Sequence, residues 1–65
     1  MKIIVNGERR EAEAVTLAAL LLDLGYEGAI VATAINGDFV PASDREAQPL
    51  GDGDRVEILA PMQGG

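Results

Sequence analysis

TLAALLLDLG, at residues 16–25, is the stretch of this 65-residue chain that decides its fold class. Thr16 is a suitable N-cap for a helix, and Gly25 stands where a helix commonly ends in a left-handed residue. Between them, four leucines have the spacing that places side chains on one helical face: Leu17, Leu20, Leu21 and Leu24. A chain this short forms one small domain, so the leucine stripe predicts a helix that packs on a sheet.

Two hairpins are expected, one on each side of this helix. Asn6-Gly7 and Asn36-Gly37 are both preferred pairs for a two-residue turn between antiparallel strands. The strands expected around these turns are residues 2–6 with 8–14, and residues 30–36 with 39–40. The return strand at 8–14 is charged and sparsely apolar, which suits the edge of a sheet.

The last part of the chain adds one more strand. A polar loop is expected at residues 42–50, with one helical turn near 44–46, and a tight turn follows at 51–54. Residues 55–60 then alternate between apolar and polar side chains, as a strand with one buried face does. These elements predict an α+β fold of the β-grasp (ubiquitin-like) type. In that fold a mixed sheet of four to five strands packs on one main helix, and the last strand lies beside the first.

The composition restricts the chemistry open to this chain. It contains no Cys and no His, which removes disulfides, thiol nucleophiles, the commonest metal ligands and the commonest general base. An oxygen-only Ca²⁺ or Mg²⁺ site at Asp52 and Asp54 stays open, but a turn explains these residues better, so we expect no metal. We also expect no catalytic residues, because the sequence offers no pair of nucleophile and base.

The net charge of −6 argues against nucleic acid as a partner, because phosphate binding needs clustered Lys and Arg. This acidity serves solubility, and it also suits steering toward a basic surface on a partner protein. No apolar run approaches the length of a transmembrane helix, and the first residues turn polar too early for a signal peptide. We therefore expect no membrane association and a cytoplasmic location.

Gly64-Gly65, at the end of the sequence, is the clearest candidate functional feature. Glycines lack a Cβ, so this tail can thread an extended backbone into a narrow active site and deliver an α-carboxylate there. We expect a β-grasp domain at residues 1–61 and a flexible tail at 62–65 with a reach of about 13–14 Å. A carboxylate is a poor electrophile at neutral pH, and the chain has no Gly-rich phosphate loop. Its activation by ATP therefore falls to a partner enzyme.

Five stretches, taken in order, carry a resemblance to a known family: residues 3–7 (IIVNG), 16–21 (TLAALL), 34–41 (AINGDFVP), 50–58 (LGDGDRVEI) and Gly64-Gly65. Over its whole length the chain resembles the ThiS-like sulfur carriers of thiamine biosynthesis. The resemblance implies that a ubiquitin-activating-type adenylating enzyme uses ATP and Mg²⁺ to form an acyl-adenylate on Gly65. Sulfur that originates from cysteine then replaces AMP, and the resulting thiocarboxylate donates its sulfur to thiazole synthase. The chain is then a protein co-substrate rather than an enzyme, and it binds no cofactor itself.

A docking surface is expected on the sheet face opposite the helix. Ile4, Leu59 and Met62 fall on that face, and exposed apolar residues there invite a partner. Three other functions stay open: a molybdopterin-synthase small-subunit type of sulfur carrier, a ubiquitin-like modifier, and a plain β-grasp interaction module. Molybdopterin-type chains are usually longer, which favours the thiamine type, and an interaction module would tolerate the loss of Gly65.

Overall fold

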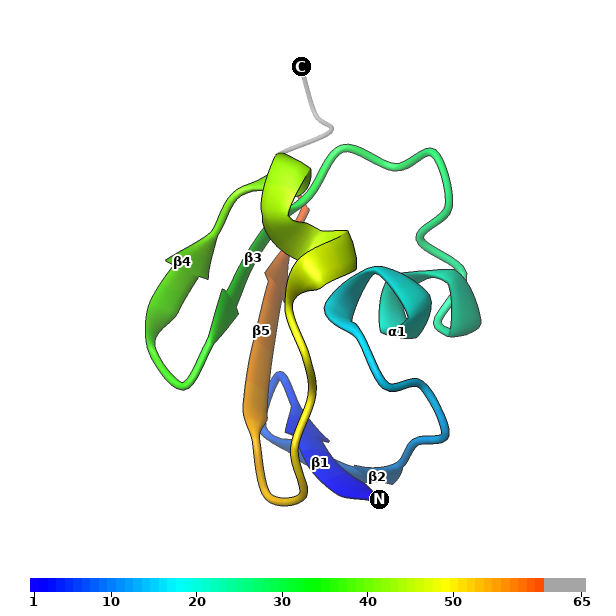
Figure 1. Cartoon of the computed structure of the whole chain (residues 1–65), viewed down its shortest axis with the longest axis vertical. Coiled ribbons are helices and arrows are strands. Elements are labelled where there is room, and N and C mark those ends of the chain that lie inside the picture. Colours follow the sequence, from blue (N-terminus) through cyan, green and yellow to red (C-terminus); the bar gives the residue numbers. More distant parts are fainter. Residues whose placement is uncertain (61–65) are drawn as a thin grey trace.

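One helix and five strands follow one another in the order that the sequence predicts. The structure, a computed structural model, describes residues 1–60, so the predicted tail at 62–65 lies outside the described residues. The elements in chain order are β1 (Lys2–Val5), β2 (Glu8–Glu11), α1 (Leu17–Asp23), β3 (Ala32–Ile35), β4 (Asp38–Val40), the 3₁₀ helix η1 (Ala42–Ala47) and β5 (Arg55–Leu59). Figure 1 shows α1 beside one face of the sheet, next to η1.

The strands form a single mixed sheet with the order β2-β1-β5-β3-β4. The pair β1–β5 is parallel, and the other three neighbouring pairs are antiparallel. The last strand therefore lies in the middle of the sheet between the two hairpins, with the first strand beside it (Figure 1). This is the α+β, β-grasp arrangement that the sequence predicts.

Both hairpins turn through the Asn-Gly pairs identified in the sequence. Asn6 and Gly7 have φ of 49° and 84°, and Asn36 and Gly37 have φ of 52° and 88°. Two consecutive positive φ values are the requirement of a type I′ turn, whose twist matches that of the strands it joins. The prediction of two tight hairpins is confirmed.

The helix α1 begins and ends with the predicted caps. The Thr16 hydroxyl accepts a hydrogen bond from the Ala19 N–H at 3.2 Å. At the other end, Gly25 has φ of 88°, and the Tyr26 N–H donates to the Leu21 carbonyl at 2.9 Å. This is the hydrogen bond of a Schellman motif, which satisfies a carbonyl that the helix leaves open. No helix within residues 1–60 has the length and apolar character needed to cross a membrane.

The leucine stripe of α1 packs on the inner face of the sheet, the face turned toward the helix. The largest buried side chains of this core are Ile3, Val5, Leu17, Leu20, Leu21, Ile35, Val40, Leu50, Val56 and Ile58. The burial of Leu50 was not predicted, because residues 42–50 were expected to form a polar loop. Its N–H donates to the Val15 carbonyl at 3.0 Å, which holds this segment beside the start of α1.

Two strands are shorter than the sequence predicts by more than one residue. β2 ends at Glu11 instead of at residue 14, because Glu11 pairs with Lys2, where β1 itself begins. β3 begins at Ala32 instead of at residue 30, because the chain is still turning at Gly28, where φ is 76°. Ile30 is 82% exposed, so the prediction of a buried strand there is wrong.

The 3₁₀ helix η1 is longer than the single helical turn expected near 44–46, and an arginine connects it to the sheet. Arg45 Nε donates to Thr33 Oγ1 at 3.0 Å, and Arg45 Nη2 donates to the Val31 carbonyl at 2.6 Å. The Thr33 hydroxyl donates in turn to the Val40 carbonyl at 2.8 Å. This network satisfies Thr33, which is buried on an otherwise apolar face.

Candidate functional site

The site residues named from the sequence fall into two groups. Met62, Gly64 and Gly65 lie outside the described residues, so their roles stay predictions. Ile4 and Leu59 lie on the outer face of the sheet, the face opposite α1, where Ile4 is half-buried and Leu59 is 68% exposed. Their placement follows the alternation of β1 and β5, but no contact tests their expected docking role.

Ile4 and Leu59 do not form one patch. In the sheet register Ile4 lies beside Arg55, whereas Leu59 is four residues further along β5. At the usual rise of a strand, four residues correspond to about 13 Å. The outer face therefore has two separate parts, one around each of these side chains.

Leu59 belongs to an apolar patch, which we define as Ala32, Ala34, Phe39 and Leu59. The register places Ala32 beside Leu59 and Ala34 beside Phe39, which is 69% exposed. These side chains border a shallow hollow of about 130 Å³ together with Glu57. Phe39 is a residue of this face that was not predicted as a site residue from the sequence. Its pairing with Ala34 follows from the Asn36-Gly37 turn, but nothing local sets the register of β3 on β5.

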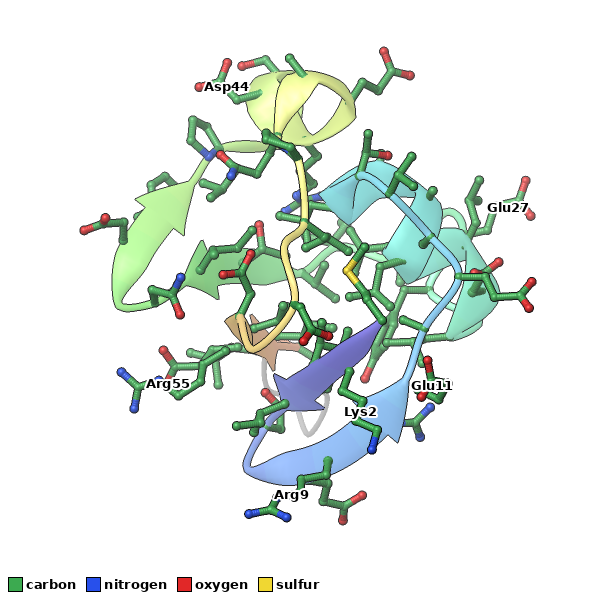
Figure 2. The ribbon with its side chains drawn as sticks, turned by 60° about the horizontal axis from the view of Figure 1, so that its bottom comes forward. Lys2, Arg9, Glu11, Glu27, Asp44 and Arg55 are labelled. Carbon is green, nitrogen blue, oxygen red and sulfur yellow. The ribbon has the colours of Figure 1, made fainter. Side chains whose placement is uncertain are left out.

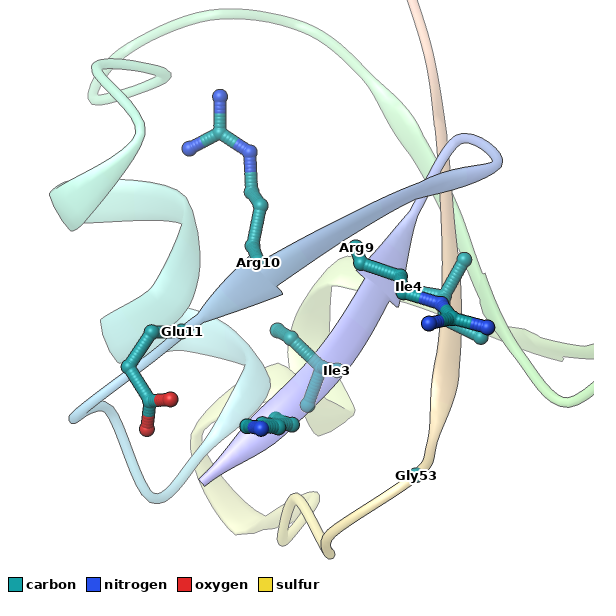
Figure 3. A pocket seen from close by; sticks show the side chains of 7 residues that line it. Ile3, Ile4, Arg9, Arg10, Glu11 and Gly53 are labelled. Carbon is teal, nitrogen blue, oxygen red and sulfur yellow. The ribbon is translucent and has the colours of Figure 1, made fainter.

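Ile4 lies between two arginines. Ile4 is the register partner of Arg9 on β2 and of Arg55 on β5, so these three side chains share the outer face. We call Arg9 and Arg55 the arginine pair. Figure 3 shows Arg9 and Ile4 at the wider hollow of about 470 Å³ along β1 and β2, with Gly53 below them.

The turn before β5 is held by its own carboxylates. Asp54 Oδ2 accepts from the Gly51 N–H at 2.7 Å, and Asp52 Oδ1 accepts from the Lys2 N–H at 2.7 Å. These bonds confirm the interpretation of this stretch as a turn. Within residues 1–60, no group of three or more acidic, His or Cys side chains could hold a metal ion.

The two hairpin asparagines hold β5 from opposite sides. Asn6 Oδ1 accepts from the Ile58 N–H at 2.8 Å, and Asn6 Nδ2 donates to the Ile58 carbonyl at 3.1 Å. Asn36 Oδ1 accepts from the Arg55 N–H at 2.9 Å, and Asn36 Nδ2 donates to Asp54 Oδ1 at 3.0 Å. The Asn6 side chain thus pairs with the backbone of Ile58 in the way that the next residue of β1 would, and it continues the hydrogen bonds between β1 and β5 toward the end of β5. From the sequence, both asparagines were predicted as turn residues only.

The exposed outer face of the described residues combines an apolar patch with cationic side chains. A five-stranded mixed sheet with β5 at its centre, one covering helix and an open outer face define a small protein of the β-grasp class.

The family follows from the sequence match. The model of the ThiS family matches residues 3–65, and this chain belongs to that family. The resemblance stated from the sequence is thereby confirmed.

Two curated relatives differ in length. The sulfur carrier protein ThiS of Thermus thermophilus is 41% identical over 61 residues, which are 94% of this chain and 95% of that protein. The thiazole synthase of Paramagnetospirillum magneticum is 41% identical over 66 aligned positions, which cover 100% of this chain and 20% of that protein. This chain therefore spans about a fifth of the length of the second relative.

Solved structures share the whole fold. The crystal structure of the thiamine biosynthesis protein ThiS from Geobacter metallireducens has a TM-score of 0.84 and 30% identity, with 100% of both chains covered. The solution structure of a thiamine biosynthesis protein from the same organism has a TM-score of 0.81 and 29% identity. It covers 100% of this chain and 88% of the other.

Proposed function

We propose that this chain is a sulfur carrier protein of thiamine biosynthesis and that Gly65 carries the sulfur as a thiocarboxylate. The observation that carries this proposal is the extent of the family match, which runs to residue 65 and so includes both Gly64 and Gly65. The relative from Thermus thermophilus, named a sulfur carrier protein, is similar over nearly the same length.

The carrier cycle begins with adenylyl transfer to the Gly65 carboxylate and continues with acyl transfer to sulfur. In the partner adenylating enzyme, with ATP and Mg²⁺, a carboxylate oxygen attacks the α-phosphorus and pyrophosphate leaves. A sulfur nucleophile that derives from cysteine then attacks the acyl carbon of the adenylate, and AMP leaves. Because the chain contains no Cys, it holds sulfur only at this carboxyl group, and it acts as a co-substrate rather than as a catalyst.

Thiazole synthase is the proposed acceptor of the sulfur. The Paramagnetospirillum magneticum relative bears that name, and a segment similar to this entire chain forms part of the same polypeptide. A covalent link of this kind raises the effective concentration of two partners that must meet. This relative favours the thiamine type over the molybdopterin type of carrier, and over a protein modifier or a plain interaction module.

The folded body supplies the docking surface in this proposal. Leu59 and its apolar patch stand at the end of β5, six positions before Gly65, and Ile4 stands with the arginine pair further back. Met62 joins them as a docking residue of the tail. Gly64 provides the clearance with which the tail enters a narrow active site.

The test is reconstituted thiazole formation with the adenylating enzyme, the sulfur donor system and thiazole synthase. Deletion of Gly65 is expected to abolish product, and Gly64→Val to reduce it strongly, with the thermal unfolding midpoint unchanged in both. Gln63→Ala is the matched control in the same tail and is expected to keep full activity. If the Gly65 deletion still supports thiazole formation, the carrier proposal is wrong.

A further inference from the structure

Cationic side chains are concentrated on one part of an acidic protein. The chain has eleven acidic and five basic residues, yet four of the five basic residues lie on β1, β2 and β5: Lys2, Arg9, Arg10 and Arg55. By the sheet register, Glu11 and Glu57 share the outer face with the arginine pair. Asp52 and Asp54 lie in the turn directly before Arg55, where their oxygens accept hydrogen bonds from backbone N–H groups. The Glu11 carboxylate is already bonded to the N-terminal ammonium group at 2.9 Å.

The arginine pair repels itself in the isolated chain. Arg9 and Arg55 flank Ile4 on the two neighbouring strands, so their Cα atoms are about 10 Å apart, which is two strand spacings. Both side chains are exposed, and neither forms an ion pair within residues 1–60. A carboxylate placed over Ile4 would lie between the strands that carry the two arginines, and arginine is well suited to bind a carboxylate with two parallel N–H donors.

The surroundings of this pair indicate a protein as its partner. Ile4 supplies apolar surface between the two cations, and the apolar patch lies further along the same face of β5, beyond Glu57. A polyanion such as nucleic acid is repelled by the net charge of −6, and the described strands offer it no further basic cluster. A protein surface that combines a carboxylate with apolar side chains is complementary both to the arginine pair and to the apolar patch.

We infer that the outer face around Arg9, Ile4 and Arg55 docks an acidic, partly apolar surface of thiazole synthase. This inference rests on the proposed function for the choice of partner. It reverses the expectation from net charge, since an acidic chain as a whole is steered toward basic surfaces, whereas this face selects an acidic one. The arginine pair then fixes the orientation of the body, and the apolar patch near the end of β5 completes the contact.

A neighbouring arginine provides the control for the experiment. Arg9 and Arg10 are adjacent on β2, but their side chains leave the strand in different directions (Figure 3). Arg10 borders a second hollow beside Leu24 and Tyr26 at the end of α1, on the inner side of the sheet. Figure 2 shows Arg9 and Arg55 both pointing away from the folded body, at the bottom and at the left of the view. Arg10 also borders the wider hollow, but it pairs with the buried Ile3 and so lies on the inner face. Charge reversal at Arg10 therefore changes the net charge equally while leaving the outer face itself unchanged.

The test measures the dissociation constant of the complete chain with purified thiazole synthase for the wild type, Arg9→Glu, Arg55→Glu and Arg10→Glu. Arg9→Glu and Arg55→Glu are each expected to weaken binding by about tenfold or more, and Arg10→Glu by about twofold or less. Raising the salt concentration should narrow the difference between the wild type and Arg9→Glu, because the contact is electrostatic. Unchanged thermal unfolding of the variants excludes a folding defect.

Two results would overturn the inference, and they separate it from the proposed function. Equal effects of Arg9→Glu and Arg10→Glu would show that only net charge matters, and the carrier proposal would stand. Failure of the wild type to bind thiazole synthase would also overturn the inference. Sulfur loading on Gly65, measured in the same preparation without the synthase, then decides whether the carrier proposal survives with a different acceptor.

Discussion

The two faces of the sheet are built from the same five strands, but they are determined by different things. On the inner face, every second residue of β1, β3 and β5 is buried under α1, including Ile3, Ile35 and Val56. On the outer face the intervening residues are half-buried or exposed, and they include arginines, a phenylalanine and a leucine. The inner face forms the core of the chain, whereas the outer face carries the exposed apolar and cationic side chains that we propose to meet a partner.

The most damaging change to the inner face is the loss of a leucine from the helix stripe. Leu20→Ala is expected to lower the free energy of unfolding by about 2–5 kcal/mol, because Leu20 is only 2% exposed and the cavity cannot fully collapse. Leu22→Ala is the matched control on the same helix, because Leu22 is 56% exposed and its loss should cost about 0.5 kcal/mol or less. Urea unfolding measures both, and equal losses would contradict the assignment of the two helix faces.

The buried threonine of the inner face gives the next largest effect. Thr33→Val keeps the shape but leaves Arg45 Nε and the Val40 carbonyl without their partner, which should cost about 1–3 kcal/mol. Combining it with Arg45→Met in a double-mutant cycle tests whether the network acts as a unit. Strict additivity of the two single losses would show that the Thr33–Arg45 bond contributes nothing.

Replacing the two hairpin asparagines should lower the free energy of unfolding by smaller amounts, which differ between the two positions. Asn6→Gly and Asn36→Gly both keep the positive φ of the turn and remove only the side-chain amide. Asn6 should cost more, about 1–2 kcal/mol, because its bonds to Ile58 are partly buried, whereas the bonds of Asn36 are exposed and should cost about 0.5–1 kcal/mol. Thermal unfolding of the two variants side by side measures the difference, and the reverse order would disprove it.

The smallest effect on stability is expected on the outer face. Leu59→Ser and Phe39→Ser should change the free energy of unfolding by about 0.5 kcal/mol or less, because both side chains are mostly exposed. The same changes should weaken binding to the partner enzymes measurably. Loss of stability comparable to that of Leu20→Ala would show that the outer face belongs to the core after all.

The inner face was predictable from the sequence because its signals are local. The period of two in the strands, the leucine spacing in α1 and the Asn-Gly turns each act within a few residues. For the outer face, the sequence predicted which single residues point outward but not which of them lie next to one another. Which outward residues meet depends on the register of β5 against its two neighbours, and this register joins positions far apart in the chain.

Three features could not be predicted from neighbouring residues alone. Phe39 and Leu59 belong to one patch only because β3 pairs with β4 on one side and with β5 on the other. Leu50 is buried by a segment that follows no strand or helix period, and Arg45 reaches Thr33 from an element twelve positions further along the chain. Ile30 shows the reverse error, since an apolar residue in a strand-like run is left exposed by the turn before it.

The central claim is that the chain carries sulfur on Gly65, and intact-protein mass spectrometry tests it most directly. The chain is incubated with ATP, Mg²⁺, the adenylating enzyme and a cysteine-derived sulfur source, and then fragmented to locate any change. The expected result is a mass increase equal to the replacement of one oxygen by sulfur, located at Gly65. An unchanged mass, with no acyl-adenylate detected under several activating enzymes, would contradict it and favour a β-grasp interaction module.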